Sequence, residues 1–309
     1  MKIIITGGAG FIGSHLTESL IEKNHKLSII TRNSTKNIKN IKNLDIVKID
    51  VGNFKKIEKF ILKVKPDLII HLAGNTSHSK SFEEPQKDLN SNLKSTLNIL
   101  EIIRKSLPKC KFLLGSTFVV IGKPKKLPIE ENSPTNPTTL YGVNKLSSEY
   151  YTKIYNQLYN IDTRIFRITN SFGPREQIIP KKNAINYLIY KAYKGEDISI
   201  YENGKFFRDL IYVSDVISGI NKIILKGKAG ELYWIGSGKK TWFYQIAKIL
   251  EKVTNAKTKY VKTPNYTKKV DVGNFVINNS KLRSLGWSPK VSVEEGIIKT
   301  IEYFKINKI

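Results

Sequence analysis

The sequence predicts an α/β fold, a doubly wound parallel sheet, and two observations lead to it. Over the first half of the 309 residues, short apolar runs of strand length alternate with segments of helical periodicity. The first apolar run leads directly into a glycine-rich segment and then into a helical pattern. Because parallel strands are joined by long crossover connections, usually helices, this alternation favours a parallel sheet with helices on both faces.

The expected elements follow in chain order. An apolar strand begins at Ile3, and further strands are expected at Leu27–Thr31, Asp45–Asp50, Leu68–Leu72 and Lys111–Gly115. Helical stretches between them include Phe54–Val64 and Leu89–Leu107. Two later segments, Leu210–Val213 and Leu232–Ile235, are expected to return to the sheet, and the last helix begins near Val293.

The glycine-rich segment fits the fingerprint of a site for a dinucleotide pyrophosphate. Its glycines are Gly7, Gly8, Gly10 and Gly13. One glycine permits the tight turn, another lets the backbone approach phosphate, and the last lets the helix pack closely on its strand. The pyrophosphate would lie at the positive N-terminus of the helix that starts near Phe11. These features predict a Rossmann domain.

After Ile168 the alternation becomes looser, which favours a smaller lobe built from separate pieces of chain. We expect the Rossmann domain to comprise residues 1–169 and 208–236. Residues 170–207 and 237–309 are expected to form a discontinuous α/β lobe that binds the substrate. Ligands of such sheets bind beyond the carboxyl ends of the strands, where the two parts would meet.

The composition argues against a membrane or secreted protein. No run approaches the roughly 18 apolar residues that a membrane span requires, and glycines interrupt the N-terminal apolar run too soon for a signal peptide. Cys110 is the single cysteine, so no internal disulfide can form, which suits a reducing cytoplasm. We expect a cytoplasmic protein without membrane contact.

The formal net charge of +26 raises the question of a nucleic-acid partner. The basic residues are mostly lysines spread along the whole chain, and no zinc, helix-turn-helix or RNP-like motif accompanies them. We therefore expect a solvated lysine-rich surface and no specific binding of nucleic acid. The charge still favours anionic ligands through electrostatic steering.

Tyr141 and Lys145 stand four residues apart in a helical pattern, so their side chains share one helix face. A free tyrosine, with a pKa near ~10, is a poor base at neutral pH, but a neighbouring ammonium group lowers that pKa. Alone, this spacing is commonly a coincidence of helices. Here it follows a strand that ends in Ser116 and Thr117, whose hydroxyls can meet the tyrosine at the sheet edge.

Together these residues resemble the extended short-chain dehydrogenase/reductases, specifically the NAD(P)-dependent epimerase/dehydratase family that acts on nucleotide sugars. The resemblance covers essentially the whole chain. Its signatures lie at residues 6–13, 50–51, 71–73, 92–100, 115–117, 141–145, 167–175, 208–209, 212–215 and 285–289. Each match alone is weak evidence, but their shared order is specific.

The resemblance implies a role for each of three catalytic residues. Thr117 takes the Ser/Thr position, Tyr141 is the acid/base, and Lys145 anchors the nicotinamide ribose and tunes Tyr141. Tyr141 would exchange a proton with a sugar hydroxyl while hydride moves between the adjacent carbon and the nicotinamide. Thr117 would hydrogen-bond to the same oxygen, unless it merely ends its strand.

The cofactor expected from the sequence is NADP(H), with NAD possible. An NAD enzyme usually carries an acidic residue about 20 positions after the glycine motif, whereas this chain has Thr31 and Arg32 there. Arg32 would pair with a 2′-phosphate, unless it is an ordinary solvated arginine. The other cofactor contacts that the resemblance implies are Gly7, Gly10, Phe11, Ile12, Gly13, Asp50, Val51, Leu72, Ala73 and Lys145.

The resemblance also implies contacts with a nucleoside-diphosphate sugar. These are His78, Thr117, Asn170, Arg208 and Lys268. Arg208 would bind the diphosphate through its planar guanidinium, and the alternative is a structural contact with the adjacent Asp209. His71 is expected to be a structural histidine. No cluster has the spacing of metal ligands, so no metal is predicted.

A departure from the family pattern narrows the reaction. Dehydratases that resemble this chain carry acidic residues directly after the catalytic threonine, but Phe118 and Val119 stand here. Redox chemistry at one sugar carbon, C4, remains. We expect a 4-keto reductase, the alternative being a 4-epimerase; a non-catalytic NADP-sensing or RNA-associated scaffold is the rival from another class. The family also implies a homodimer, and helices 89–107 and 147–158 are the candidates for its interface.

Overall fold

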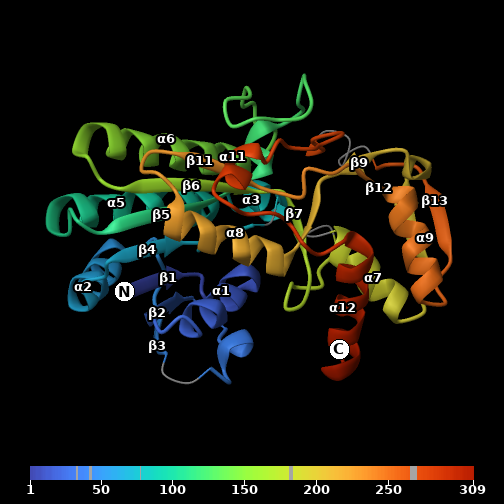
Figure 1. Ribbon diagram of the computed structural model, residues 1–309, viewed down its shortest axis with the longest axis horizontal. Helices are drawn as coiled ribbons and strands as arrows, with labels where there is room; N and C mark the ends of the chain where they lie inside the picture. The colour runs from blue at the N-terminus through green and yellow to red at the C-terminus, as the bar shows by residue number, and fades with distance from the viewer. Residues whose placement is uncertain (33, 42–43, 77, 181–183, 265–269) are drawn as a thin grey trace.

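A seven-stranded sheet forms the centre of the larger lobe (Figure 1). The computed structural model describes residues 1–309 except 33, 42–43, 77, 181–183 and 265–269. In spatial order the strands are β11 (Leu232–Ile235), β6 (Thr163–Ile168), β5 (Lys111–Thr117), β4 (Leu68–His71), β1 (Lys2–Thr6), β2 (Lys26–Thr31) and β3 (Asp45–Lys48). All neighbouring pairs run parallel. The strand order reverses between β1 and β4, which is where such sheets bind ligands.

The central strands are apolar on both faces because helices cover both sides of the sheet. In β1, Ile3 and Ile5 contribute to one hydrophobic core and Ile4 to the other. The first face carries α1 (Phe11–Ile21) and α8 (Val213–Lys226). The second carries α2 (Phe54–Val64), α5 (Ser95–Ser106) and α6 (Leu140–Tyr159). The predicted doubly wound parallel sheet is confirmed.

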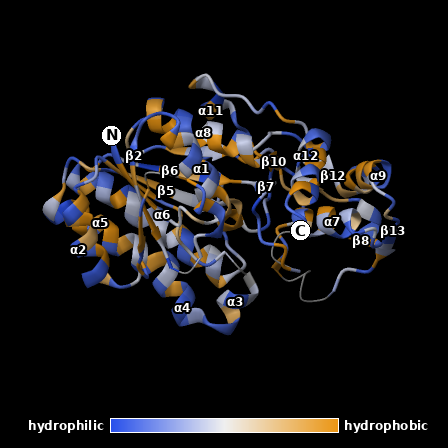
Figure 2. Cartoon of the chain, turned by 90° about the horizontal axis from the view of Figure 1, so that it is seen from below, coloured by the Kyte–Doolittle hydropathy of each residue, from blue (hydrophilic) through white to orange (hydrophobic). Residues whose placement is uncertain are grey.

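The smaller lobe lies at the end of the molecule away from α2 and α5 (Figure 2). Its helices are α7 (Ala184–Tyr193), α9 (Phe243–Val253) and α12 (Val293–Ile306). Its paired strands are β7 (Asn170–Phe172) with β10 (Leu210–Tyr212), β8 (Ile198–Tyr201) with β13 (Thr258–Val261), and β9 (Phe207–Arg208) with β12 (Thr241–Trp242). One hydrophobic core continues from the sheet into this lobe, reaching Ile189, Leu250 and Phe304. The division into domains by residue number stays a prediction.

One expectation about the elements was wrong. Residues Leu210–Val213 were expected in the main sheet, but β10 pairs with β7 in a separate two-stranded sheet. The chain leaves the main sheet after Ile168 and offers β7 as a new parallel partner, while β11 occupies the place beside β6. The helical stretch expected at Leu89–Leu107 is confirmed: α4 (Pro85–Leu89), a π-helical turn (Asn90–Lys94) and α5 follow one another without a break. Two further short helices are α3 (His78–Glu83) and α11 (Ser280–Ser284).

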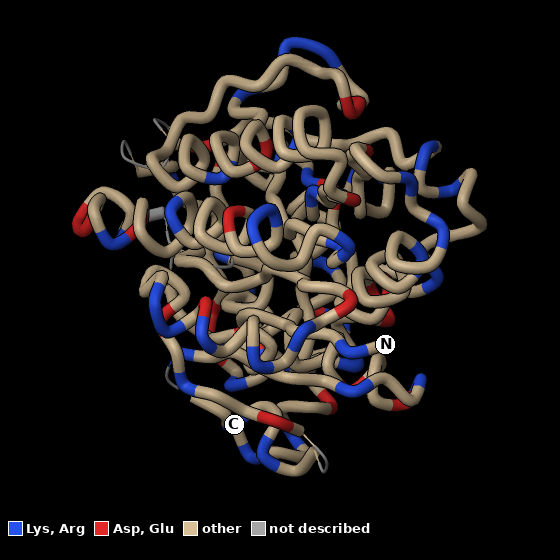
Figure 3. Tube along the Cα trace, turned by 90° about the vertical axis from the view of Figure 1, so that its left-hand side faces the viewer, with Lys and Arg blue, Asp and Glu red and all other residues tan. Residues whose placement is uncertain are grey.

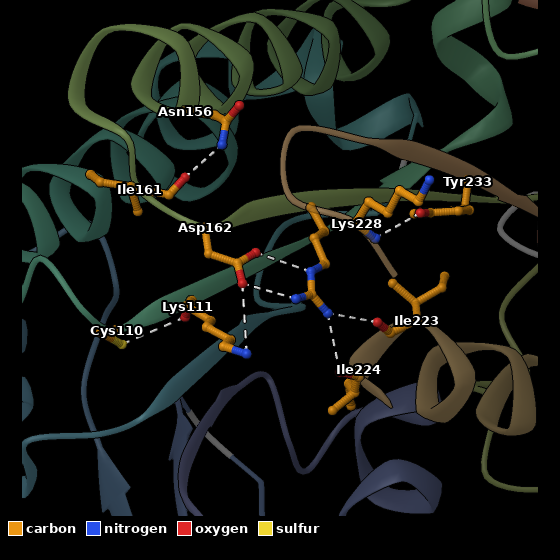
Figure 4. A network of polar contacts seen from close by, with 10 residues as sticks. Cys110, Lys111, Asn156, Ile161, Asp162, Ile223, Ile224, Lys228 and Tyr233 are labelled. Carbon is orange, nitrogen blue, oxygen red and sulfur yellow. Dashed lines mark hydrogen bonds and ion pairs between the residues drawn. The ribbon is translucent and has the colours of Figure 1, made fainter. Parts of the chain in front are cut away.

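The end of α8 is fixed by a buried arginine at the amino ends of the strands (Figure 4). Arg164 donates from Nε and Nη2 to the Asp162 carboxylate, at 3.0 and 2.8 Å. Its Nη1 donates to the carbonyls of Ile223 and Ile224, at 2.8 and 3.1 Å. The last carbonyls of a helix lack a full set of partners within it. The Ile223 carbonyl accepts from the Gly227 amide at 2.9 Å, so the guanidinium adds a second donor there and supplies one to the Ile224 carbonyl.

We therefore expect Arg164→Met to destabilise the fold. The Ile223 and Ile224 carbonyls would each lose one hydrogen bond and the Asp162 carboxylate two, at a cost of about 2 kcal/mol in the free energy of unfolding. Urea unfolding of the variant measures this loss. Arg283→Met removes an exposed arginine on α11 and should change the free energy of unfolding by less than about 0.5 kcal/mol. Equal effects of the two substitutions would contradict a structural role for Arg164.

Basic residues are spread over the trace among fewer acidic ones, as Figure 3 shows. The expectation that the protein binds no specific nucleic acid stays a prediction. Within the described ranges, no helix is both long enough and apolar enough to cross a membrane.

Candidate functional site

The turn between β1 and α1 forms a cradle that only glycine can line. Gly7 has a φ of +73°, and a Cβ there would lie 2.8 Å from the amide nitrogen of Ala73. A Cβ on Gly13 would lie 2.1 Å from the carbonyl oxygen of Gly7. Gly10 caps α1 without a side-chain hydrogen bond, and the first turn of α1 holds no acidic residue. The first amides of the helix are therefore open to an anion, which fits a dinucleotide pyrophosphate.

The residues predicted for the adenosine end lie after β2 and β3. Thr31 is buried, and its hydroxyl donates to the Ser34 carbonyl at 3.3 Å. Asp50 is exposed, and its carboxylate accepts from the Gly52 amide at 2.8 Å. Arg32 is exposed as well. Glu84 has a lowered pKa, chiefly through its hydrogen bond with Lys87, and the charge of Arg32 adds to this effect. Arg32 thus lies in the field of a carboxylate.

Three predicted catalytic side chains come together at the carboxyl end of β5. The cap of α6 is Thr139, whose hydroxyl accepts from the Gly142 amide at 3.0 Å and sets the start of the helix. Lys145 donates from Nζ to the Gly115 carbonyl on β5 at 2.6 Å. The hydroxyl of Tyr141 is hydrogen-bonded to the side chain of Thr117. The i, i+4 spacing therefore does place both helix residues against one strand.

Burial decides the protonation of this cluster in the protein alone. It raises the pKa of Tyr141 well above its ordinary value; the hydrogen bond from Thr117 opposes this, and the charge of Asp88 adds to it. The expectation that the pKa of Tyr141 is lowered was wrong for the protein alone, because loss of solvation dominates. Burial also lowers the pKa of Lys145 to about 8, against the raising effects of Glu149 and Asp88.

A buried ion pair behind Lys145 escaped the sequence analysis. Glu149, one turn further along α6, accepts from the Ser116 hydroxyl at 2.5 Å. Arg167 donates to both oxygens of Glu149, at 2.9 and 2.7 Å, and lies 5.3 Å from the Trp234 ring centre. Removing either partner would leave an uncompensated buried charge. The four-residue spacing from Lys145 to Glu149 was the available signal.

His71 closes β4 beneath the site and has both ring nitrogens engaged. Nδ1 shares a hydrogen bond of 2.7 Å with the Thr6 hydroxyl, and Nε2 one of 3.1 Å with the Ser95 hydroxyl. Complete burial and, to a smaller extent, the charge of Lys145 lower the pKa of His71 to about 3. The ring is therefore neutral at ordinary pH, as expected of a structural histidine.

We expect His71 to make the protein sensitive to acid. Its pKa is about 3 in the fold against 6.5 as the ordinary value, so unfolded chains bind the extra proton between these pH values. As the pH decreases through that window, the free energy of unfolding should fall by up to about 1.4 kcal/mol for each pH unit. Unfolding titrations of His71→Gln should lack this component, whereas those of His25→Gln, at a partly exposed site, should retain it.

Two predicted substrate contacts lie in the smaller lobe. Asn170 on β7 has a buried side-chain oxygen with no hydrogen-bond partner among the described residues. Arg208 on β9 is buried, and its Nη2 donates to the carboxylate of Asp271 at 2.5 Å. The alternative pairing of Arg208 with Asp209 was wrong, because Asp209 accepts from backbone amides that include that of Ser237 at 2.7 Å.

Two further predicted contacts cannot be placed. Lys268 lies outside the described residues. His78 begins α3, and its side chain lies outside the described part of the chain.

A glycine cradle at the switch point of a parallel sheet, next to a Thr–Tyr–Lys cluster, defines a dinucleotide-binding enzyme of the short-chain dehydrogenase/reductase class. The sequence model of the family described as GDP-mannose 4,6 dehydratase matches residues 4–300. The chain belongs to this family, within the extended epimerase/dehydratase branch that the sequence resembles.

Several relatives and solved structures of similar length are named as epimerases, and others as dehydratases. A putative UDP-glucose 4-epimerase of Methanocaldococcus jannaschii is 34% identical over 307 residues, covering 99% of both chains. The UDP-glucose 4-epimerase of Thermotoga maritima, solved with UDP-glucose, has a TM-score of 0.92 and 29% identity over 100% of both chains. That of Thermus thermophilus, solved with NAD, has a TM-score of 0.89 and 25% identity over 99% of both chains.

Proposed function

We propose that the protein is a nucleotide-sugar 4-epimerase whose substrate is a UDP-hexose. The observation that carries the proposal is the cluster of Thr117, Tyr141 and Lys145 at the carboxyl end of β5, beside the glycine cradle. The sequence alone favoured a 4-keto reductase. Full-length relatives and neighbours named UDP-glucose 4-epimerase favour the alternative that was left open.

Each side chain of the cluster has its own role in the proton transfer at the sugar. Tyr141 accepts the proton of the C4 hydroxyl and later returns it, and Thr117 hydrogen-bonds to the same oxygen. Lys145 holds the nicotinamide ribose, and its charge favours the phenolate. A nicotinamide, when bound, would accept a hydride from C4 of the sugar and return it to the same carbon. Its positively charged oxidised form would also favour the phenolate. Arg208 and Asn170 hold the diphosphate and orient the sugar.

The residues after Thr117 support redox chemistry without elimination of water. Phe118 packs against Phe275, with 5.1 Å between ring centres, and Val119 is buried. Both belong to a short 3₁₀ turn, Phe118–Ile121. Elimination needs a side chain that exchanges a proton at the neighbouring carbon, and these two cannot do so. We infer that the protein is not a dehydratase, although its family carries that name.

We propose NAD as the cofactor, kept in the site through turnover. An epimerase returns the hydride it takes, so it has no need to exchange its cofactor, and the T. thermophilus neighbour is solved with NAD. Arg32, which predicted NADP, lies near the charge of Glu84. Gently purified protein, once denatured, should release NAD⁺ in near-stoichiometric amount. An empty site that binds added NADPH more tightly than NADH would overturn this assignment.

The function is tested by supplying UDP-glucose without added cofactor. The expected result is its C4 epimer, and the same final mixture should form when the reaction starts from that epimer. Oxidation of NADPH that depends on a 4-keto sugar would establish the reductase instead. Absence of turnover together with salt-sensitive binding of RNA would favour the scaffold. Formation of a dehydrated sugar would contradict the argument from Phe118 and Val119.

We also propose a homodimer formed through α5 and α6. These helices pack side by side, and α6 exposes Tyr150, Ile154 and Leu158 at helical spacing, by 55%, 43% and 67%. Such an apolar stripe favours a second apolar surface. Sedimentation equilibrium should give twice the chain mass of 35.2 kDa. Ile154→Glu should dissociate the dimer, and Leu225→Glu, at an exposed position on α8, should not.

A further inference from the structure

Asp88 is a fully buried carboxylate that collects donors from three separate elements. Its Oδ1 accepts from the side-chain amides of Asn75, in the loop after β4, at 2.9 Å and of Asn92, in the π-helical turn, at 3.1 Å. Its Oδ2 accepts from the amide of Asn144 on α6 at 2.8 Å. Three N–H donors around one carboxyl group match the ionised form, which can only accept.

No cation compensates this charge by direct contact among the described residues. None of their ion pairs includes Asp88, and its hydrogen-bond donors are the neutral side-chain amides of Asn75, Asn92 and Asn144. A buried carboxylate without a paired cation is costly, and because no cation cancels its charge, that charge acts on nearby titratable groups. The groups affected are the ammonium group of Lys145 and the phenol of Tyr141, because the charge of Asp88 acts to raise the pKa of both.

The bonds of Asp88 also determine where the catalytic helix lies. Asn144 stands between Tyr141 and Lys145 on α6, so its bond to Asp88 holds the turn that carries both. The Asn92 carbonyl in the π-helical turn accepts from the Ser148 hydroxyl at 3.1 Å, which fixes the next turn of α6. π-Helical turns expose carbonyls for such bonds and are frequent at functional sites.

The same network fixes the loop after β4. The Asn92 amide donates to the Asn75 carbonyl at 3.2 Å as well as to Asp88. A Cβ on Gly74 would lie 2.3 Å from the Asn92 side-chain oxygen, so the loop and the π-helical turn are in close contact. Asp88 therefore joins the loop, the turn and the helix that surround the reaction centre.

We propose that Asp88 is a positioning residue for the reaction: its buried negative charge keeps Lys145 an ammonium ion, and its amide bonds hold α6 in register with the loop after β4. The proposal rests on the proposed function for its catalytic meaning, but the binding of cofactor alone can test it.

The charged and titratable neighbours determine the sign of the effect. Lys145 faces Asp88 from α4, Glu149 from its own helix and the neutral His71 from β4. Burial lowers the pKa of Lys145, and the two carboxylates raise it. Tyr141 faces Thr117 from β5 and Asp88 from α4, and Asp88 raises its pKa. Loss of the Asp88 charge should lower the pKa of both groups.

The experiment measures the dissociation constant of NAD by calorimetry between pH 6 and pH 10. In the wild-type protein, affinity should fall as pH passes the pKa of Lys145, about 8, because the neutral amine holds the ribose less well. Asp88→Asn keeps the shape and removes the charge, and its midpoint should move down by roughly one pH unit. Lys145→Met should show no such transition.

Controls separate the charge from the bonds and from folding. Asn144→Ala removes one amide bond but keeps the charge, so it should lower kcat and leave the midpoint in place. Should Asp88→Asn fail to fold, the reciprocal Asp88→Asn/Asn144→Asp variant restores a carboxylate–amide pair and should return the midpoint to the wild-type value or above. An unchanged midpoint in Asp88→Asn, or a midpoint below the wild-type value in the reciprocal variant, overturns the proposal. Normal NAD binding without epimerisation would instead reject the proposed function alone.

Discussion

Tyr141→Phe is expected to lower kcat by about two to four orders of magnitude, the range that a positioned acid or base contributes. The phenylalanine ring fills the same buried place beside Thr117 but has no hydroxyl to exchange a proton with the C4 oxygen. The dissociation constants of NAD and UDP should change little, because neither ligand relies on that proton. Single-turnover measurements at saturating UDP-glucose check the prediction.

The chain offers a matched control on the same helix. Tyr155 is also buried on α6, but its hydroxyl donates to the Glu101 carboxylate at 2.6 Å, away from β5. Tyr155→Phe should cost about 1 kcal/mol in the free energy of unfolding and leave kcat unchanged. A similar fall of kcat in both variants would mean that α6 is merely disturbed. A wild-type kcat in Tyr141→Phe would remove Tyr141 from the mechanism.

The parts of the site that depend on local sequence could be predicted. The cradle at Gly7 and Gly13 follows from a strand, a tight turn and a helix that are contiguous in the chain. The shared face of Tyr141 and Lys145 follows from helical periodicity alone. The structural role of His71 was expected for a histidine at the end of an apolar strand.

Parts that depend on long-range pairing could not be predicted. The apolar run at Leu210 predicts a strand, but nothing local specifies β7 as its partner. The structural contact weighed as the alternative for Arg208 was with its neighbour Asp209, whereas its carboxylate partner, Asp271, is 63 residues away. Asp88 stands in a polar segment, and it is buried where the loop after β4, the π-helical turn and α6 meet around it.

The pKa of Tyr141 also could not be predicted from the sequence, because it depends on long-range packing. The sequence identifies a nearby ammonium, which favours the phenolate, but it does not reveal how completely the phenol is removed from water. In the fold, desolvation outweighs the other effects and the pKa rises. Burial is a property of the whole packing arrangement, so the sign of such a shift follows only from the structure.

Arg208→Met is expected to weaken the binding of UDP by about 30-fold, which corresponds to roughly 2 kcal/mol for charge-assisted hydrogen bonds to phosphate. Arg208 is buried on β9 and held by Asp271 and by the Phe207 carbonyl, at 2.5 and 3.0 Å. Its guanidinium is therefore fixed before the ligand arrives. Calorimetry with UDP alone measures the effect without reference to turnover.

The loss must be separated from a general effect of positive charge, since the protein carries +26. Lys240 provides the control, because it is exposed and its Nζ lies 5.3 Å from the Phe207 ring centre, near β9. Lys240→Met removes the same charge but no fixed donor, so it should weaken UDP binding less than about threefold and mainly at low salt. Arg208→Lys keeps the charge without the planar fork and should fall between the two. Equal losses in Arg208→Met and Lys240→Met would mean that the surface attracts the diphosphate and that Arg208 does not bind it.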